Sequence, residues 1–261
     1  MTVATSTVLG RPLWYELMTT DMNAAEAFYK KVVGWTGAPF PGSPEPYTLL
    51  RRNGDVPVAG VMPKPKEVDA PPFWAMYVGV PNLERAAEHI ARLGGKACSP
   101  VIDVPTIGRM QMMADPQGAA FYIYEPVPSS DPRPEGQAVE GEGSWHELMT
   151  TDAQAAMNFY ADVFGWQPSE TMDMGEMGKY HMFNRPHGMI GGIMNKGPEM
   201  ASVPPFWQIY FLVPDIPAAV DRIKANGGQI LNGPMEVPGG DWIVNAMDPQ
   251  GAAFSLHARK R

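Results

Sequence analysis

Two glutamates in a repeated segment are the side chains best suited to chemistry. Glu16 lies in WYELMTTD and Glu147 lies in WHELMTTD. Strand alternation places each glutamate on the same face as a tryptophan, Trp14 or Trp145. A carboxylate on such a face is partly desolvated, which raises its pKa and suits proton transfer. The structural alternative is that each glutamate accepts hydrogen bonds from backbone amides or a tyrosine hydroxyl, and a duplication copies both kinds of residue.

A second set of residues could enclose an apolar or aromatic ligand. Aromatic rings supply stacking surfaces, and methionines supply soft, adaptable walls. Amide side chains would add polar contacts. The alternative for each residue is an ordinary place in the core. The candidate ligand-binding residues are Trp14, Trp145, Met18, Met149, Tyr122, Gln111, Gln208 and Asn245.

Several other chemistries find no support in the sequence. GxSxG, CxxC, HExxH and phosphate-loop patterns do not occur, which disfavours acyl transfer, dithiol redox chemistry and nucleotide hydrolysis. Asp115 and Asp248 lie in turns, where we expect them to bond their own downstream amides. The histidines do not recur between the two halves of the chain and are expected to be structural or solvated. The alternative is one metal site in the second half, built from Glu147 and His181.

The composition restricts partners and compartment. The formal net charge is −8, and phosphate backbones need a basic surface, so a nucleic-acid partner is not expected. The single cysteine, Cys98, cannot form an internal disulfide, which favours a reducing cytoplasm. The first ten residues lack the basic start of a secretory signal, and no apolar run is long enough to span a membrane. A small molecule is the expected partner.

The chain contains the same pattern twice. The motifs FY, GW, PPFW and DPQGAAF follow WYELMTTD and recur after WHELMTTD, with Trp14 and Trp145 separated by 131 positions. A repeat of more than about 100 residues has the size of a whole domain. Residues 127–143 are rich in Pro, Gly, Ser and Glu and are predicted to be a linker. The expected domains are therefore residues 1–126 and residues 144–261.

Each half divides again into two modules of one element order. In the first module, LWYELMT alternates as a strand, Asp21 caps a helix, and Gly34 ends that helix. Strands are expected near residues 47–51 and 58–62, joined at Asn53 and Gly54. In the second module, FWAMYVGV is a strand and Asn82 caps a helix. The strands RMQMMA and AAFYIYE then follow, joined by the DPQG turn. The second half repeats both patterns, which predicts an α+β chain of four βαβββ modules.

This element order, with TTDxxAAxxFY, GW and DPQGAAF, resembles the vicinal oxygen chelate superfamily. That superfamily includes glyoxalase I, extradiol dioxygenases and bleomycin- or fosfomycin-resistance proteins. The resemblance covers nearly the whole chain. It implies that two modules curl into one half-open barrel, here called a cup, so that four modules form two glyoxalase-like half-open barrels in tandem.

The resemblance also implies where a divalent metal would be held. Family ligands lie on the first strand of each module and on the last strand after the DPxG turn. The matching residues here include aromatic and small side chains, which are not usual ligands of hard or borderline cations. We therefore expect no metal site and no cofactor, and a divalent metal is disfavoured. The matching positions are Trp14, Ala75, Tyr122, Trp145, Gln208 and Ser255.

The leading hypothesis is a metal-independent protein that binds an apolar or aromatic small molecule in its cups. It resembles the sequestering, resistance-type members more than the lyases. One alternative is a lyase, dioxygenase or hydroxylase-like enzyme, with unusual metal ligands or with Glu16 or Glu147 as a metal-free base. Another is a scaffold whose cups face partner proteins. The tandem halves predict an intrachain pseudo-dimer, and both a monomer and a homodimer of the chain stay open.

Overall fold

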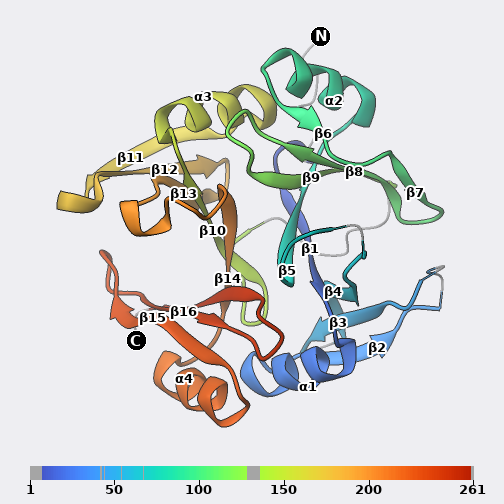
Figure 1. Ribbon diagram of the computed structural model, residues 1–261, viewed down its shortest axis with the longest axis vertical. Helices are drawn as coiled ribbons and strands as arrows, with labels where there is room; N and C mark the ends of the chain where they lie inside the picture. Colours follow the sequence, from blue (N-terminus) through green and yellow to red (C-terminus); the bar gives the residue numbers. More distant parts are fainter. Residues whose placement is uncertain are drawn as a thin grey trace. The chain divides into compact units, whose positions relative to one another are not determined.

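The computed structural model describes residues 8–41, 43, 45–53, 55–66, 68–127 and 136–259. Helices and strands follow the predicted order of four βαβββ modules (Figure 1). The first module contains β1 (Pro12–Thr19), α1 (Met22–Val32), β2 (Thr36–Pro39), β3 (Thr48–Arg52) and β4 (Val56–Pro63). The second contains β5 (Phe73–Gly79), α2 (Leu83–Arg92), β6 (Lys96–Ala97), β7 (Ile102–Val104), β8 (Gly108–Ala114) and β9 (Ala120–Pro126).

The second half repeats this order with two added turns of 3-10 helix. The third module contains β10 (Gly143–Thr150), α3 (Ala153–Phe164), β11 (Gln167–Asp173), η1 (Gly175–Met177), β12 (Lys179–Arg185), β13 (Gly188–Asn195) and η2 (Pro198–Met200). The fourth contains β14 (Phe206–Leu212), α4 (Ile216–Ala225), β15 (Gln229–Glu236), β16 (Trp242–Met247) and β17 (Ala253–Ala258).

Each long helix begins at the predicted type of cap. A side-chain oxygen of the cap accepts a hydrogen bond from the backbone amide three residues later, which satisfies an amide that has no partner inside the helix. Gly34 and Gly165 follow α1 and α3 with positive φ angles of 91° and 68°, where glycine avoids the strain of a side chain. The capping residues are Asp21, Asn82, Asp152 and Asp215.

All four modules share one strand topology. The first strand of each module runs parallel to the last, as in β1 with β4 and β14 with β17, and the remaining long strands pair antiparallel. The strand orders are β2-β3-β4-β1, β5-β9-β8-β6, β11-β12-β13-β10 and β14-β17-β16-β15, and β7 pairs with β8. Among the described residues, strand pairing assigns nine strands of the first half to one sheet and eight of the second half to another. The predicted fold class is confirmed. Gly54, in the predicted hairpin turn, lies outside the described residues.

Two compact units group the modules differently from the sequence. Unit 1 contains the described residues of Met1–Leu13, Met76–Gly136 and His146–Trp207, and unit 2 contains those of Trp14–Ala75, Gln137–Trp145 and Gln208–Arg261. Helices α2 and α3 contact each other in unit 1, and α1 and α4 contact each other in unit 2 (Figure 1). Each unit therefore takes most of one module from each half. The predicted sequence domains, 1–126 and 144–261 with a linker at 127–143, stay a prediction.

The repeated aromatic motifs build the core of each unit. In unit 2, Tyr29 and Trp74 pack edge to face, with ring centroids 5.2 Å apart. In unit 1, the repeat partners Tyr160 and Trp207 pack in the same way, also at 5.2 Å. Edge-to-face pairs add about 0.5–1.5 kcal/mol to the burial of their area. The other rings of these clusters are Phe28, Trp35, Phe211 and Phe254 in unit 2, and Phe121, Phe164, Trp166 and Phe183 in unit 1.

Inside unit 2, a buried series of hydrogen bonds links two residues of the first half to one residue of the second half. Trp74 Nε1 donates to Tyr29 Oη at 2.9 Å, and Tyr29 Oη donates to Asp248 Oδ2 at 3.1 Å. Asp248 Oδ1 accepts the amides of Gln250 and Ala252. This confirms the predicted turn role of Asp248. Burial, and then the neighbouring carboxylate, raise the pKa of Tyr29, and burial raises the pKa of Asp248.

Unit 1 repeats the chain with the repeat partners of these residues. Trp207 Nε1 donates to Tyr160 Oη at 3.1 Å, and Tyr160 Oη donates to Asp115 Oδ2 at 3.0 Å. Asp115 Oδ1 accepts the amide of Ala119 at 2.8 Å. We call these two groups of residues the Trp-Tyr-Asp chains of unit 1 and unit 2. Each chain pairs polar groups that would be costly to bury without a hydrogen-bond partner.

Candidate functional site

The first predicted glutamate lies in a polar cluster on β1 and β4. Glu16 is 6% exposed, and its register partner on β4 is Gly60. A side chain at Gly60 would overlap the Tyr47 hydroxyl, so the Tyr47 ring lies directly against this point of the strand. Trp14 Nε1 donates to Tyr47 Oη at 3.0 Å. The fold therefore brings a tryptophan, a tyrosine hydroxyl and a glutamate to neighbouring positions.

The second glutamate lies beside a matching tyrosine and glycine in unit 1. Glu147 is half-buried on β10, and its register partner on β13 is Gly192. A side chain at Gly192 would overlap the ring of Tyr180. Tyr180 Oη donates to Glu147 Oε2 at 3.1 Å. A phenol bonded to a carboxylate can hold or pass a proton, and can also stabilise a strand pair without any chemistry.

Sequence reasoning missed the two tyrosines. Tyr47 lies just before β3 and its repeat counterpart Tyr180 lies in β12, and Gly60 and Gly192 recur on the next strands. The signal was therefore present, but it is spread over strands far from the glutamates in sequence. Only the register that opposes Gly60 to Glu16, and Gly192 to Glu147, connects them.

Most of the predicted apolar ligand-binding residues are buried among neighbouring side chains. Met18 and Met149 are buried. Tyr122 is buried and stacks on Tyr77 with ring centroids 4.2 Å apart and planes 3° from parallel. Trp145, like Trp14, is half-buried. Of these side chains, the two tryptophans keep the most accessible ring surface.

The predicted amide side chains are bonded to other residues. Gln208 Nε2 donates to Ser255 Oγ at 2.8 Å, and Ser255 Oγ donates to Asn245 Oδ1 at 2.7 Å. The structure therefore brings Gln208 and Asn245 together through a serine. Gln111 lies elsewhere and donates to the carbonyl of Ser99 at 2.9 Å.

The histidines have local partners. His146 is buried, its Nδ1 lies 2.7 Å from the Ile190 carbonyl, and burial lowers its pKa to about 4. His181 Nδ1 lies 3.2 Å from Thr171 Oγ1 on the adjacent strand. Because Tyr180 points toward Glu147, strand alternation turns the next residue, His181, to the opposite face. The alternative metal site built from Glu147 and His181 is therefore not supported by this register.

The residues at the family's metal positions do not fit a divalent cation. Tyr122 is stacked, and the polar atoms of Gln208 and Ser255 bond each other. None of these groups is the imidazole or carboxylate that such ions prefer. Across the part of the chain that the structure describes, His, Cys, Asp and Glu side chains do not gather in any group of three able to hold a metal.

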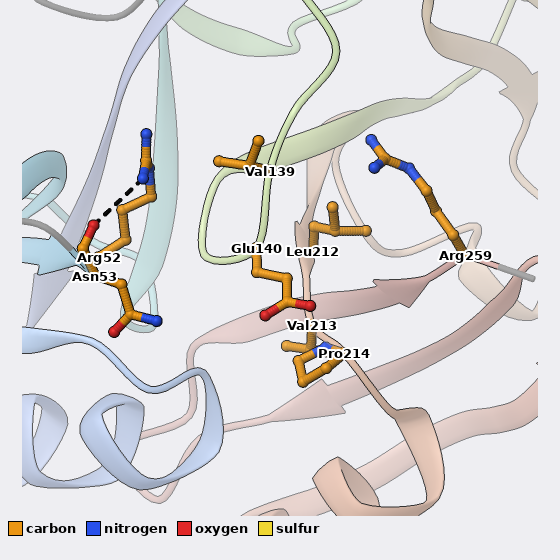
Figure 2. Close-up of a pocket in the computed structure, with 8 residues that line it drawn as sticks. All are labelled: Arg52, Asn53, Val139, Glu140, Leu212, Val213, Pro214 and Arg259. Atoms are coloured by element: carbon orange, nitrogen blue, oxygen red, sulfur yellow. Dashed lines mark hydrogen bonds between the residues drawn. The ribbon is translucent and has the colours of Figure 1, made fainter. Parts of the chain in front are cut away.

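Two cavities open in unit 2. One, of about 530 Å³, is lined by Tyr47 together with residues at the end of β1 and the start of α1, including Thr19 and Met22. The other, of about 460 Å³, lies against the end of β14 and is shown in Figure 2. Tyr47, from the first polar cluster, lines the larger of these two cavities. Among the described residues, no helix has the length and apolar character needed to cross a bilayer.

Comparisons with known proteins give the chain its family. The family model of the Glyoxalase/Bleomycin resistance protein/Dioxygenase superfamily matches residues 144–256. CFP32 of Mycobacterium tuberculosis, which carries a glyoxylase name, is 32% identical over 95% of this chain and 94% of its own. The anthracycline biosynthesis protein DauV of Streptomyces sp. (strain C5) is 29% identical over 95% of this chain and 92% of its own.

A solved structure shares the fold at lower identity. The Mn(II)-bound glyoxalase of Novosphingobium aromaticivorans superposes with a TM-score of 0.68 and 17% identity, over 97% of this chain and 83% of its own. This likeness concerns the fold alone. The family model match and the identity to CFP32 across nearly the whole length give the assignment: the chain belongs to the glyoxalase/bleomycin resistance protein/dioxygenase superfamily.

Proposed function

We propose that the protein binds small aromatic molecules in its cups without a divalent metal. The observation that carries the proposal is the recurrence of Glu opposite Gly with a tyrosine against it; Tyr180 donates to Glu147 in one copy, and Trp14 donates to Tyr47 in the other. Trp14 and Trp145 would stack on the ligand, and the glutamate and tyrosine would supply its polar contact. Met18, Met149, Tyr122, Gln111, Gln208 and Asn245 are retained as proposed surroundings of the ligand.

The chemistry of the cluster favours an aromatic ligand that carries a hydroxyl or carbonyl group. A carboxylate accepts hydrogen bonds, and a tyrosine hydroxyl both donates and accepts. A phenolic or quinone-like ring could therefore bond to this pair while it stacks on an indole. The similarity to DauV, named for anthracycline biosynthesis, supports this class, because anthracyclines are fused aromatic rings with such groups.

Ligand binding can be tested with anthraquinone sulfonate as a soluble flat probe. We expect a saturable rise in the melting temperature of the protein, because a ligand that binds the folded state alone stabilises it. The double variant Trp14→Ala, Trp145→Ala should lose most of this rise. The matched control is Trp242→Ala, since Trp242 is 39% exposed on β16, outside the proposed cluster. An equal rise in the double variant and the control would refute the proposed cup.

A second candidate is a metal-free enzyme of the same superfamily, lyase, dioxygenase or hydroxylase-like. The 3.1 Å bond between Tyr180 and Glu147 favours it, because this pair could move a proton to or from a bound ring. Product formation from a bound phenol or quinone, followed by mass spectrometry, should disappear in the double variant Glu16→Gln, Glu147→Gln. Turnover that persists in this variant would leave only the binding function.

Metal content separates both candidates from a metalloenzyme. We expect protein purified without chelator to contain less than stoichiometric zinc, nickel, manganese and iron by elemental analysis. Stoichiometric metal would contradict the proposal directly.

We also propose that the protein acts in the cytoplasm on a small molecule, with no nucleic-acid or membrane partner, as an intrachain pseudo-dimer. The exposed thiol of Cys98 suits a reducing compartment.

A further inference from the structure

Three side chains of unit 2 form a hydrogen-bonded chain that neither proposed function uses. Ser144 Oγ, at the start of β10, lies 2.9 Å from His257 Nδ1 on β17. His257 Nε2 lies 2.8 Å from Asp241 Oδ2, in the residue just before β16. All three residues are partly exposed. Ser144 Oγ also has the carbonyl of Tyr210 as a hydrogen-bond acceptor at 3.2 Å, so its single hydroxyl proton is shared between this carbonyl and His257 Nδ1.

The chemistry of these groups sets the direction of each hydrogen bond. An ionised carboxylate only accepts, so His257 Nε2 carries the proton and donates it to Asp241. In a neutral imidazole the other nitrogen, Nδ1, is then an acceptor, and Ser144 Oγ donates to it. A hydroxyl bonded to the basic nitrogen of an imidazole that a carboxylate orients is the arrangement of an activated serine nucleophile.

The duplication provides an internal comparison. The first-half counterparts of Ser144, His257 and Asp241 are Leu13, Tyr124 and Gly108, from the offsets of 131 and 133 positions between the repeats. The hydroxyl of Tyr124 donates to the Ile107 carbonyl instead. The first-half copy of the fold therefore forms without a Ser-His-Asp group at these positions. In contrast, the Trp-Tyr-Asp chains recur in both units.

A cavity opens on the strand face that carries His257. Leu212 is the register partner of His257, so the two side chains point to the same face. Arg259 lies two residues beyond His257, just after the end of β17. Leu212 and Arg259 both line the cavity of about 460 Å³, and Figure 2 shows Leu212 between Val139 and Arg259. An apolar residue and a cation that line this cavity are thus neighbours of His257, Leu212 in strand register and Arg259 in sequence.

We propose that Ser144, His257 and Asp241 form a nucleophilic site that hydrolyses short carboxylic esters. Ser144 Oγ bonds to the ester carbonyl carbon while its proton passes to His257 Nδ1. The carbon-oxygen bond to the alcohol then breaks, and His257 gives that proton to the leaving alcohol. A water molecule attacks the acyl-serine, its proton passes through Nδ1 back to Ser144 Oγ, and the carboxylic acid is released. Asp241 holds the imidazole in the required tautomer throughout.

The test uses the full chain, p-nitrophenyl butyrate and a fluorophosphonate probe. We expect release of nitrophenolate, and covalent labelling of one peptide, the one containing Ser144, identified by mass spectrometry. Ser144→Ala and His257→Gln should each lower the hydrolysis rate by about 100-fold or more, as removal of a nucleophile or its base does in such sites. Ser144→Cys should gain labelling by iodoacetamide at that position.

The matched control is His89→Gln. His89 Nε2 lies 2.6 Å from Asp162 Oδ1 in unit 1, and this histidine-carboxylate pair has no serine partner among the hydrogen bonds of His89. Its loss should leave hydrolysis and labelling unchanged. Circular dichroism and the melting temperature establish that each variant is folded. Hydrolysis by Ser144→Ala at the rate of the parent, or labelling of the parent at another residue, would overturn the proposal.

Discussion

The buried polar side chains of the two Trp-Tyr-Asp chains are paired, and the pairing explains why certain motifs recur. FY supplies Tyr29 and PPFW supplies Trp74, while the DPQG turn of the other half supplies Asp248. A tyrosine hydroxyl that hydrogen-bonds both an indole and a carboxylate is needed by both neighbours. Its loss would leave a buried polar group on each of them without this partner. Residues that look like candidates for catalysis in the sequence can thus be fixed by burial alone.

Removal of one hydroxyl should reveal this dependence. We expect Tyr29→Phe to lower the free energy of unfolding by about 1–3 kcal/mol, because Trp74 Nε1 and Asp248 Oδ2 each lose a buried partner. Urea unfolding, followed by tryptophan fluorescence, measures the loss. Tyr160→Phe, the repeat counterpart, should cost a similar amount. A cost below about 0.5 kcal/mol for both variants would show that the chains contribute little.

His146 should make stability depend on pH. Burial lowers its pKa from the ordinary 6.5 to about 4, so the unfolded chain binds the proton more readily between these values. The contribution of His146 to stability is therefore fully present above pH 6.5 and is lost as the pH falls toward 4. At about 1.4 kcal/mol for each pKa unit, the loss reaches about 3 kcal/mol.

The measurement compares the parent with His146→Gln in urea at a series of pH values. The stability difference between the two proteins should shrink or reverse as the pH falls from 7 toward 4. The control is His89→Gln, which removes a histidine that is only half-buried. Parallel pH profiles for the parent and His146→Gln would mean that His146 titrates at its ordinary value.

At the scale of elements, glycines on β4 and β13 decide how close a tyrosine ring can come to a glutamate. Gly192→Ala should displace the ring of Tyr180, because the new side chain would overlap it, and the bond to Glu147 should be lost. We expect about a tenfold weaker affinity for anthraquinone sulfonate at this cup, measured by fluorescence titration. That change corresponds to about 1.4 kcal/mol of binding energy.

A neighbouring residue on the same strand provides the control for this prediction. Met189, on β13, is 49% exposed, so Met189→Ala should change neither the hydrogen bond nor the affinity. A crystal structure of Gly192→Ala would show directly whether Tyr180 has moved. Unchanged affinity together with a displaced tyrosine would remove Tyr180 from the proposed binding group.

The elements were predictable because local chemistry specifies them. Asp21 and Asn82 cap helices through their own side chains, and DPQG closes a hairpin through Asp115, so short windows of sequence suffice. The candidate site was only partly predictable. Glu16 could be placed by alternation, but Tyr47 reaches Trp14 from the segment just before β3, and strand register is set by the whole sheet. The serine-histidine pair joins residues 113 positions apart.

At the scale of the whole molecule, each compact unit combines modules from the two halves. Tyr29, in the first half, bonds Asp248 in the second, and the ring of Phe28 packs on Phe254. The first half contains equivalents of both second-half residues, since Asp115 and Phe121 occupy the same places in its own DPQGAAF motif. A half-chain therefore carries both partners of this contact, but on two different modules.

This arrangement predicts what separate halves will do. We expect residues 1–127, expressed alone, to form a homodimer in which Tyr29 of one copy bonds Asp115 of the other, because a folded monomer would expose the aromatic cluster around Phe28. Sedimentation velocity gives the mass of the species. Tyr29→Phe combined with Asp115→Ala in the same half should weaken the dimer, whereas Asp103→Ala, at an exposed position on β7, should not. A folded monomer at micromolar concentration would mean that one half can bury its aromatic cluster without a second copy.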